Sequence, residues 1–201
     1  MSTDHEPAPI RPELIEAYRG IAPATLGHMP GVRVMASAIK PGYRDCKLVG
    51  PAFTVRAVGL DVSATNEACE RIQAGQIMVV DRGADYEHAC IGEFRALAQQ
   101  QKGVAGWVVD GASTDILELE AMRFPVFART WSALVGRAAG GVGDIDVPIA
   151  CGGVVVYPGD LIVADDNGVV VLSAQQADAL LPHCQEVERR EAEQRLVYQR
   201  R

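Results

Sequence analysis

GWVVDGASTDILELEAM, residues 106–122, joins a strand-like half to a helix-like half and shows the pattern on which the chain is built. Its apolar run ends at Asp110-Gly111. Two hydroxyl residues and a second acid, Asp115, then open a stretch with helical character. A short apolar run closed by a turn-forming pair is typical of a buried strand. The segment therefore predicts a strand that ends at Asp110, a turn, and a short helix.

The segments on either side repeat this alternation. QIMVVD (76–81) and FPVFART (124–130) are further strand-like runs, and EHACIGEFRALAQQQKG (87–103) predicts a helix that Gly103 ends. The expected apolar face of this helix consists of Cys90, Phe94, Leu97 and Ala98. Strands and helices in this order predict βαβ units with parallel pairing.

The chain before residue 76 predicts four more elements. IRPELIEAYRGI (10–21) indicates a short helix, and PATLGHMPG (23–31) indicates a turn-rich linker. KLVGPAFTVRAV (47–58) predicts a strand with a bend at Gly50-Pro51. SATNEACERIQAG (63–75) predicts a helix that Gly75 ends and whose buried face holds Ala64, Ala68 and Ile72.

The last third of the chain changes character. VPIACGGVVVYPGDLIVADDNGVVVLS (147–173) contains short strand-like runs separated by glycine and proline pairs. Its DDNG sequence predicts a hairpin in which Asn167-Gly168 supplies positive φ. A long helix follows from Ala174 and becomes strongly charged after Cys184, so we expect its final turns to extend beyond the core. We predict a single α/β domain divided into an N-terminal helical segment (1–22), a core (23–173) and a C-terminal helical tail (174–201).

Composition limits the classes of function. The 201 residues are 48% hydrophobic and 22% charged, which fits a folded domain. A net charge of −7 argues against nucleic acid as the main partner, because phosphates attract basic surfaces. No apolar run is long enough for a membrane span, and the polar, acidic N-terminus is unlike a secretory signal. Five scattered cysteines without a C-x-x-C motif predict reduced thiols in a cytoplasmic protein without structural zinc.

Two neighbouring segments could bind a ligand. In open α/β sheets ligands collect beyond the carboxyl ends of the strands, where helix N-termini point. Gly92, near the start of a helix, leaves backbone N–H groups free for a carboxylate or phosphate. Glu93 and Asp115 would place two carboxylates in the same crevice, an arrangement that suits a hard divalent cation such as Mg²⁺.

Each of these residues also has a purely structural interpretation. For Asp115, a helix cap is the better interpretation than a metal ligand, with Glu118 as the other half of a capping box. Glu93 fits an acid in a first helical turn, and Gly92 fits tight helix-to-sheet packing. Arg95 fits a solvated helix residue. GRAAGGVGD (136–144) is similar to a phosphate-binding loop but lacks the established glycine spacings, so a flexible loop is the better interpretation.

Taken together, the motifs resemble a known family. VGPAFTVRA, IGEFRALAQQQKGVAGWVVDGASTD, FPVFART and GGVVVYPGDLIVADDNGVVVL occur in this order. This order is similar to that in the family of the regulator of ribonuclease activity A and the class II 4-hydroxy-4-methyl-2-oxoglutarate aldolases. The resemblance covers the chain from about Pro23 to the C-terminal helix. It implies a swivelling β/β/α-type sandwich assembled as a homotrimer or a dimer of trimers, with active sites at subunit interfaces.

The resemblance also implies an activity and a set of site residues. Asp115 would hold Mg²⁺ or Mn²⁺, Glu93 would be the acid of the glycine–acid pair, and the amides of Phe94 and Arg95 would hold the substrate's carboxylate. A neighbouring subunit would contribute a further acid, with Glu191 or Glu193 as candidates. The expected reaction is cleavage of a carbon–carbon bond in a small 2-oxo acid through a metal-stabilised, pyruvate-type enolate, with oxaloacetate decarboxylation as a side activity.

The chain departs from the family pattern at Thr114, where the family has an arginine that contacts the substrate. Threonine supplies neither a charge nor a bidentate fork. Arg95, two residues after Glu93, is a cation close to the expected site and could partly replace the missing charge. Two other functions remain open: a non-catalytic regulator that binds a protein through its acidic surface, and a lyase or hydratase of different specificity.

Overall fold

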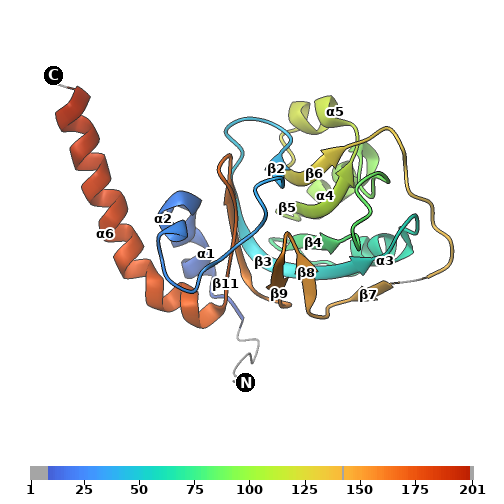
Figure 1. Ribbon diagram of the computed structural model, residues 1–201, viewed down its shortest axis with the longest axis horizontal. Helices are drawn as coiled ribbons and strands as arrows, with labels where there is room; N and C mark the ends of the chain where they lie inside the picture. The colour runs from blue at the N-terminus through green and yellow to red at the C-terminus, as the bar shows by residue number, and fades with distance from the viewer. Residues whose placement is uncertain (1–8, 142, 200–201) are drawn as a thin grey trace.

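The computed structural model describes residues 9–141 and 143–199, and a large curved sheet forms its centre (Figure 1). The strand order is β1-β11-β10-β3-β4-β5-β6-β2, and β7 pairs with β3 beside this path. The strands are β1 (Arg33–Val34), β2 (Lys40–Pro41), β3 (Leu48–Ala57), β4 (Ile77–Asp81), β5 (Gly106–Ser113), β6 (Val126–Trp131), β7 (Gly143–Ile145), β10 (Leu161–Asp165) and β11 (Gly168–Leu172). A separate hairpin consists of β8 (Ile149–Cys151) and β9 (Val154–Val156).

The parallel half of the sheet confirms the predicted βαβ units. Strands β3 to β6 are parallel neighbours, and each crossover between them contains a helix. These helices are α3 (Ser63–Arg71), α4 (Glu93–Gln101) and α5 (Ile116–Ala121). Because such crossovers are right-handed, all three helices cover one face of the sheet.

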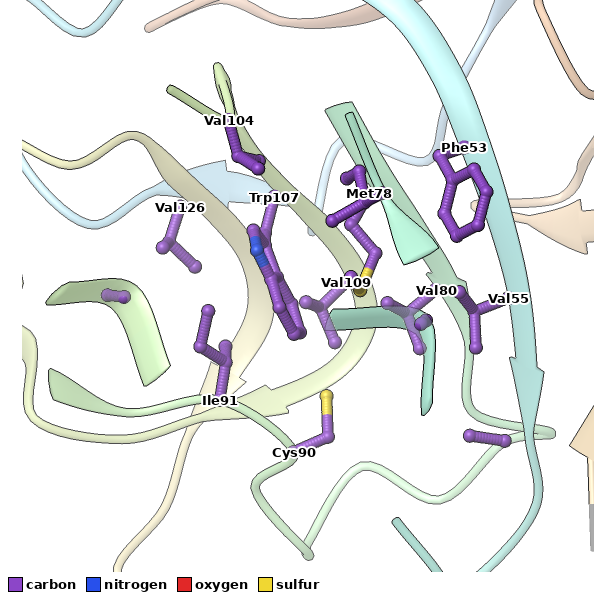
Figure 2. Close-up of a cluster of buried hydrophobic side chains, with 14 of the residues drawn as sticks. Phe53, Val55, Met78, Val80, Cys90, Ile91, Val104, Trp107, Val109 and Val126 are labelled. Atoms are coloured by element: carbon purple, nitrogen blue, oxygen red, sulfur yellow. The ribbon is translucent and has the colours of Figure 1, made fainter. Parts of the chain in front are cut away.

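Alternate strand residues serve two separate cores, which explains the continuous apolar runs of β4 and β5. Met78 and Val80 face α3 to α5 together with Trp107 and Val109 (Figure 2). Ile77, Val79 and Val108 lie in a second core, which includes residues of the β8–β9 hairpin. Successive side chains of a strand point to opposite faces, so a strand covered on both faces is apolar throughout.

A third core lies under the helices at the two ends of the chain. Helices α1 (Pro12–Arg19), α2 (Pro23–Gly27) and α6 (Ala174–Gln199) share it with strands β10 and β11. The Tyr18 hydroxyl donates a buried hydrogen bond of 2.9 Å to the Ala177 carbonyl, which joins α1 to the start of α6. Residues 191–199 are exposed, and Figure 1 shows the outer half of α6 projecting from the molecule, as predicted. The predicted sandwich with a C-terminal helix is confirmed.

Two predicted elements, the linker 23–31 and the strand expected to end at Asp110, differ from the prediction. The linker 23–31 contains α2, because Pro23 starts a helical turn that buries Thr25 and Leu26. Strand β5 does not end at Asp110 but runs to Ser113 through a bulge. Gly111 is therefore not a turn residue: a Cβ there would lie 2.8 Å from Arg82 Cβ. Gly111 leaves room for the Arg82 stem to pass.

The helix predicted over 87–103 begins only at Glu93, and the prediction of its apolar face was wrong. Its buried residues are Ala96 and Gln99, whereas Phe94 is 83% exposed and Leu97 is 37% exposed. Cys90 is buried, but it lies in the loop before the helix. Apolar spacing predicts a buried face only when a partner within the same chain covers it.

The predicted hairpin near Asn167 is confirmed, but its turn differs in detail. Asp165 pairs with Gly168, so Asp166 and Asn167 form the turn. Of the predicted pair, Gly168 has a positive φ of 154°, but Asn167 is not among the positive-φ residues. The Asp165 carboxylate instead accepts hydrogen bonds from the backbone and side-chain nitrogens of Asn167. The Asp165 side chain, at the first turn position, thus stabilises the turn without a left-handed conformation at Asn167.

The described residues include no helix that is long and apolar enough to cross a membrane. All five cysteines are free thiols, as predicted from their spacing.

Candidate active-site cavity

A cavity of about 220 Å³ lies where the loop before α4 meets the end of β5. It brings together five of the six predicted site residues: Gly92, Phe94, Arg95, Thr114 and Asp115. The side chain of Glu93, the sixth, is not part of the cavity wall. The remaining wall is mainly apolar and consists of Val62, Ala89, Cys90, Ile91, Val135 and Gly136.

Backbone hydrogen bonds join the loop 90–92 to the end of β5. The Cys90 amide donates to the Ala112 carbonyl at 3.2 Å, and the Thr114 amide donates to the Ile91 carbonyl at 3.0 Å. The buried Ser113 hydroxyl donates to the same Ile91 carbonyl at 3.2 Å. These bonds fix the start of α4 against the residues that follow β5, and so they set the distance between the two predicted halves of the site.

The Asp115 carboxylate lies directly at the N-terminus of α4. Its Oδ2 accepts a hydrogen bond of 2.8 Å from the Glu93 amide, and its Oδ1 lies 3.2 Å from the Thr114 hydroxyl, which donates to it. A Cβ on Gly92 would collide with Asp115 Oδ2 and would lie 2.7 Å from Thr114 Cγ2. Gly92 is thus required by the close approach of Asp115, because its own φ of −149° is open to any residue.

The structure overturns the capping-box prediction for Asp115. Asp115 precedes α5 but makes no side-chain hydrogen bond to that helix, and it has a left-handed backbone with φ 56° and ψ 46°. This conformation turns its side chain away from α5 and toward α4. Asp is one of the few non-glycine residues that adopt it readily. The carboxylate therefore caps the preceding helix in the chain, and it remains exposed to solvent on its other side.

The first turn of α4 presents further donors to the cavity. The first intrahelical bond runs from the Ala96 amide to the Gly92 carbonyl, so the amides of Phe94 and Arg95 precede it. Such amides at a helix N-terminus attract anions. Among the described residues of the cavity wall, Arg95 is the only basic one and Asp115 is the only acidic one. The cavity thus combines one cation, one carboxylate and unused amides within apolar walls.

The opposite wall comes from the long segment after β6. The Ala89 amide donates to the Leu134 carbonyl at 2.8 Å, and the Gly136 amide donates to the Ala89 carbonyl at 2.9 Å. A Cβ on Gly136 would lie 3.0 Å from the Leu60 carbonyl oxygen, so this glycine permits a close backbone approach. Isolated β-bridges pair Arg137 with Asp61 and Val135 with Ala89, so this segment lies beside them like a short strand.

The glycine-rich loop 136–144, which is similar to a phosphate-binding loop, binds the carboxylate of Asp61 through its backbone amides. Asp61 is 8% exposed, and its carboxylate accepts hydrogen bonds from the amides of Ser63, Ala139 and Gly141 at 2.8, 3.1 and 3.1 Å. The sequence favoured a flexible loop over 136–144, whereas the described part of this loop is fastened by hydrogen bonds to Asp61 and Ser63. Its amides fasten the loop to the start of α3 beside the cavity.

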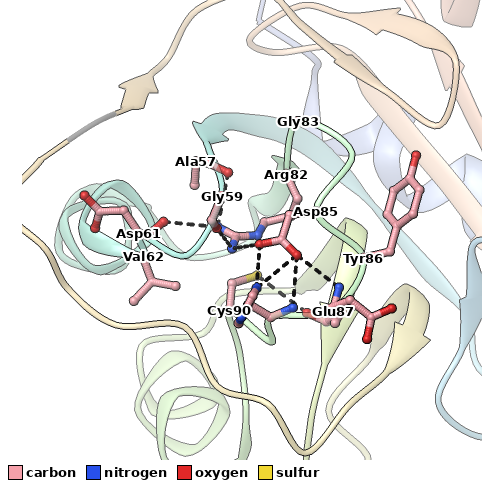
Figure 3. A network of polar contacts seen from close by, with 12 residues as sticks. Ala57, Gly59, Asp61, Val62, Arg82, Gly83, Asp85, Tyr86, Glu87 and Cys90 are labelled. Carbon is pink, nitrogen blue, oxygen red and sulfur yellow. Dashed lines mark hydrogen bonds and ion pairs between the residues drawn. The ribbon is translucent and has the colours of Figure 1, made fainter.

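Sequence reasoning missed Arg82, a fully buried arginine that supports the same region. Its guanidinium donates to the carbonyls of Ala57 (3.1 Å), Gly59 and Asp61 (3.2 Å), and it lies 3.6 Å from Asp85 (Figure 3). Arg82 thereby closes the loop that carries Val62 into the cavity wall. In the sequence DRGADYEH it is indistinguishable from a solvated charge, since only the carbonyls of a distant loop make its burial possible.

The thiol of Cys90 faces the cavity region but is not set up as a nucleophile. Burial raises the pKa of Cys90 to about 11, although the positive charges of Arg82 and Arg95 oppose the rise. The thiol is therefore protonated at neutral pH, and a protonated thiol is a poor nucleophile.

The other acids singled out in the sequence lie elsewhere. Asp110 accepts from Arg129 Nε at 2.5 Å and from the Gly152 amide at 2.7 Å, so it ties β5 to β6 and to the β8–β9 hairpin. Glu191 and Glu193 lie on the exposed outer part of α6, where each pairs with an arginine of the same helix. Among the described residues, no group of three or more His, Cys, Asp or Glu side chains could hold a metal ion.

Comparisons with known proteins agree with one another. A family model described as RraA-like, Aldolase/RraA, matches residues 12–171. A Halalkalibacterium halodurans protein with the name "Putative 4-hydroxy-4-methyl-2-oxoglutarate aldolase" is 38% identical over 153 residues, which are 76% of this chain and 72% of the relative. A Thermus thermophilus protein named 4-hydroxy-4-methyl-2-oxoglutarate aldolase is 34% identical over 127 residues, 63% of this chain and 76% of the relative.

A solved structure shares the fold along almost the whole length. The crystal structure of Streptomyces coelicolor RraAS2, described as an unusual member of the RNase ES inhibitor RraA protein family, superimposes with a TM-score of 0.81 at 27% sequence identity. The superposition covers 93% of this chain and 98% of the other.

Proposed function

This chain belongs to the RraA-like aldolase family, and on that premise we propose that it is a divalent-metal-dependent carbon–carbon lyase acting on a small 2-oxo acid. The position of Asp115 carries the proposal. Its carboxylate stands at the edge of a cavity, beside the amides that begin α4. The names of the relatives support an aldolase or lyase class.

The donor chemistry around Asp115 fits Mg²⁺ or Mn²⁺. Mg²⁺ keeps several of its waters and needs only one or two carboxylates from the protein. A cavity with one exposed carboxylate and room for water meets that requirement, whereas a structural zinc site needs four protein ligands. Asp115 would hold the cation, and the hydroxyl of Thr114 would orient the carboxylate.

The residues of the cavity divide the remaining tasks. A bound divalent cation would supply a Lewis acid for the keto oxygen of the substrate. The amides of Phe94 and Arg95 would donate hydrogen bonds to the substrate's carboxylate. The apolar wall formed by Ile91 and Val135 would exclude water from the bond that breaks. In the retro-aldol reaction that bond leaves its electron pair on the carbon next to the keto group, and that carbon then takes up a proton.

Two further groups of acids have roles in the proposed mechanism. Glu93 contributes its amide, which holds Asp115, and a catalytic role for its side chain stays a prediction. The hydroxyl of the substrate must lose a proton to a base, and we assign this base to Glu191 or Glu193 of a neighbouring copy. Both carboxylates are exposed on the projecting part of α6 and could reach another molecule.

The reaction can be tested by measuring pyruvate release from oxaloacetate and from branched 4-hydroxy-2-oxo diacids, with Mg²⁺, with Mn²⁺ and with EDTA. We expect release that EDTA abolishes and either metal restores. Asp115→Asn removes the anionic ligand and should lower kcat/KM by at least about 100-fold, because metal-assisted charge stabilisation is worth several kcal/mol.

Glu118→Gln provides a matched control, since Glu118 is an exposed acid of α5 outside the cavity wall. It should leave turnover and metal affinity unchanged. Turnover that persists in EDTA, or no turnover on any of these substrates, would contradict the proposal.

A protein-binding regulator is the second candidate function. The description of the Streptomyces coelicolor structure as a member of a ribonuclease-inhibitor family supports it, and the net charge of −7 is compatible with it. Capture of a ribonuclease from lysate by immobilised protein, together with calorimetry that detects no Mg²⁺ or Mn²⁺ binding, would favour the regulator. A lyase or hydratase of different specificity would appear in the substrate panel instead, and Thr114 is the residue that makes this outcome worth testing.

A further inference from the structure

Among the described residues, Arg95 is the one basic residue of the cavity wall, and no carboxylate forms a salt bridge with it. The four other described arginines of restricted exposure each pair with an aspartate: Arg33 with Asp160, Arg56 with Asp144, Arg82 with Asp85, and Arg129 with Asp110. Within the described part of the chain, the Arg95 guanidinium lies against the Cys69 thiol instead. A partly buried guanidinium has five N–H donors in a fixed fork, which suits a carboxylate. The missing partner therefore points to an anion from outside the chain.

Arg95 also lies at the boundary between two recesses, which is called the passage below. It lines the candidate cavity together with Asp115, and it lines a second recess of about 320 Å³ between α3 and α4. Phe94 is the other residue shared by the two. The first turn of α4 thus separates a site for an oxo-acid head from a neighbouring space that can take a longer substrate.

The second recess is polar at its far side. Its α3 residues are Asn66, Cys69 and Glu70. Burial raises the pKa of the Cys69 thiol, and the neighbouring Arg95 guanidinium opposes the rise, so this thiol and the guanidinium are close together. Glu70 repels an anion that would pass deeper, whereas Arg95 attracts it at the passage. Within the second recess, the position beside the Arg95 guanidinium is therefore the favourable one for a second carboxylate of the substrate.

We propose, on the basis of the lyase function above, that Arg95 is a specificity-determining residue whose guanidinium binds a distal carboxylate of the substrate at the passage between the two recesses. The α4 amides and the cation site at Asp115 receive the oxo-acid end. Arg95 then distinguishes a 2-oxo diacid from a 2-oxo monoacid of the same length. Thr114 cannot perform this task because its hydroxyl is uncharged and already donates to Asp115.

A binding experiment with two matched, unreactive probes tests the inference. 2-Oxopentanedioate and 2-oxopentanoate have the same carbon chain and differ only in a terminal carboxylate or methyl group. In calorimetry with Mg²⁺ present, the full-length protein should bind the diacid at least about tenfold more tightly, the ratio expected for one charge-assisted contact. Arg95→Gln should bring the two affinities to within about twofold by weakening only the diacid, and Arg95→Lys should keep part of the preference.

Arg71→Gln is the matched control, because Arg71 is exposed on α3, pairs with Glu67 and lines neither recess. It should leave both affinities unchanged, and circular dichroism should show the same fold in all variants. The inference is overturned if the wild type lacks the preference for the diacid or if Arg95→Gln keeps it. Absent pyruvate release alongside an Arg95-dependent preference would remove the proposed reaction and leave the binding role of Arg95 standing.

Discussion

Gly92 shows how a single missing side chain can position a carboxylate. Its backbone is extended, so steric strain within the residue does not require glycine. The requirement comes from Asp115 and Thr114, which occupy the space where a Cβ would lie. A close contact of this kind is invisible in a sequence, where the same glycine fits both an anion-binding loop and helix packing.

Gly92→Ala should therefore displace the Asp115 carboxylate. We expect Mg²⁺ or Mn²⁺ affinity to fall by at least about tenfold, as for other changes to groups that orient a metal ligand. Overpacking should lower the free energy of unfolding by about 1–3 kcal/mol. Calorimetric titration and urea unfolding measure the two effects. Gly27→Ala is the control, since Gly27 lies in α2 with open space around its Cβ position. Equal metal affinities of Gly92→Ala and wild type would contradict the assignment of Asp115.

Two buried thiols predict a loss of stability at alkaline pH. Burial raises the pKa of Cys46 and of Cys90 from 9.0 to about 11 in the folded protein. Above pH 9 the unfolded chain releases these protons and the folded chain keeps them, so unfolding becomes more favourable as pH rises toward 11. Each thiol should contribute a decrease of about 1 kcal/mol per pH unit in that window.

Urea unfolding of the reduced protein at pH 8, 9 and 10 measures this decrease. Replacing Cys46 by Val should make the pH dependence shallower, since one of the titrating groups is then absent. Equal free energies of unfolding at pH 8 and pH 10 would show that these thiols do not retain their protons in the folded state.

At the scale of elements, strands were predicted better than helices. The runs at β4, β5 and β6 are apolar because both faces of the sheet are covered, and this signal is local. Helix α4 was misjudged, because its apolar residue Phe94 is exposed while Gln99 is buried. The bulge in β5 was also missed. The Arg82 side chain, from the loop after β4, packs against Gly111 in this part of β5, and a local sequence pattern does not reveal that contact.

Helix α6 has two halves with different roles. In the part before the exposed residues 191–199, the Glu188 carboxylate accepts hydrogen bonds from the Ala22 amide at 2.9 Å and from the Thr25 hydroxyl at 2.7 Å, at the start of α2. Glu188→Ala should lower the free energy of unfolding by about 1–2 kcal/mol, as expected when a helix N-terminus loses its acceptor. Removing residues 191–201 should change it by less than about 0.5 kcal/mol, because the described part of this tail is exposed.

Urea unfolding at several protein concentrations compares the two variants and reveals any contribution from assembly. A truncation as destabilising as Glu188→Ala at low concentration would mean that the tail packs against its own chain.

For the whole molecule, the sequence predicted the family and the layered fold, and five of the six predicted site residues line the cavity. It could not predict the supports of that cavity. Asp61 and Arg82 are buried charges whose partners are mainly backbone groups of distant loops, and no local pattern distinguishes them from surface charges. The division of the chain at residues 22 and 173, and the cation itself, stay predictions.

Large apolar side chains around the cavity predict how copies of the chain assemble. Phe94 is 83% exposed and Val135 is 58% exposed in the cavity wall, and Leu117, two residues after Asp115, is 71% exposed on α5. Exposed apolar residues grouped around a pocket are typical of an interaction surface. We expect a homotrimer, or a dimer of trimers, in which a second copy covers this surface and completes the site.

Light scattering after size exclusion tests this assembly against the chain mass of 21.5 kDa. Phe94→Asp should shift the mass toward that of one chain, because burying an unpaired carboxylate at an interface is strongly unfavourable. Val155→Asp is the control, since Val155 is 46% exposed on β9, away from the cavity wall, and its replacement should leave the mass unchanged. A wild type that elutes with the mass of one chain would leave the cavity open to solvent and would remove any neighbouring acid from the mechanism.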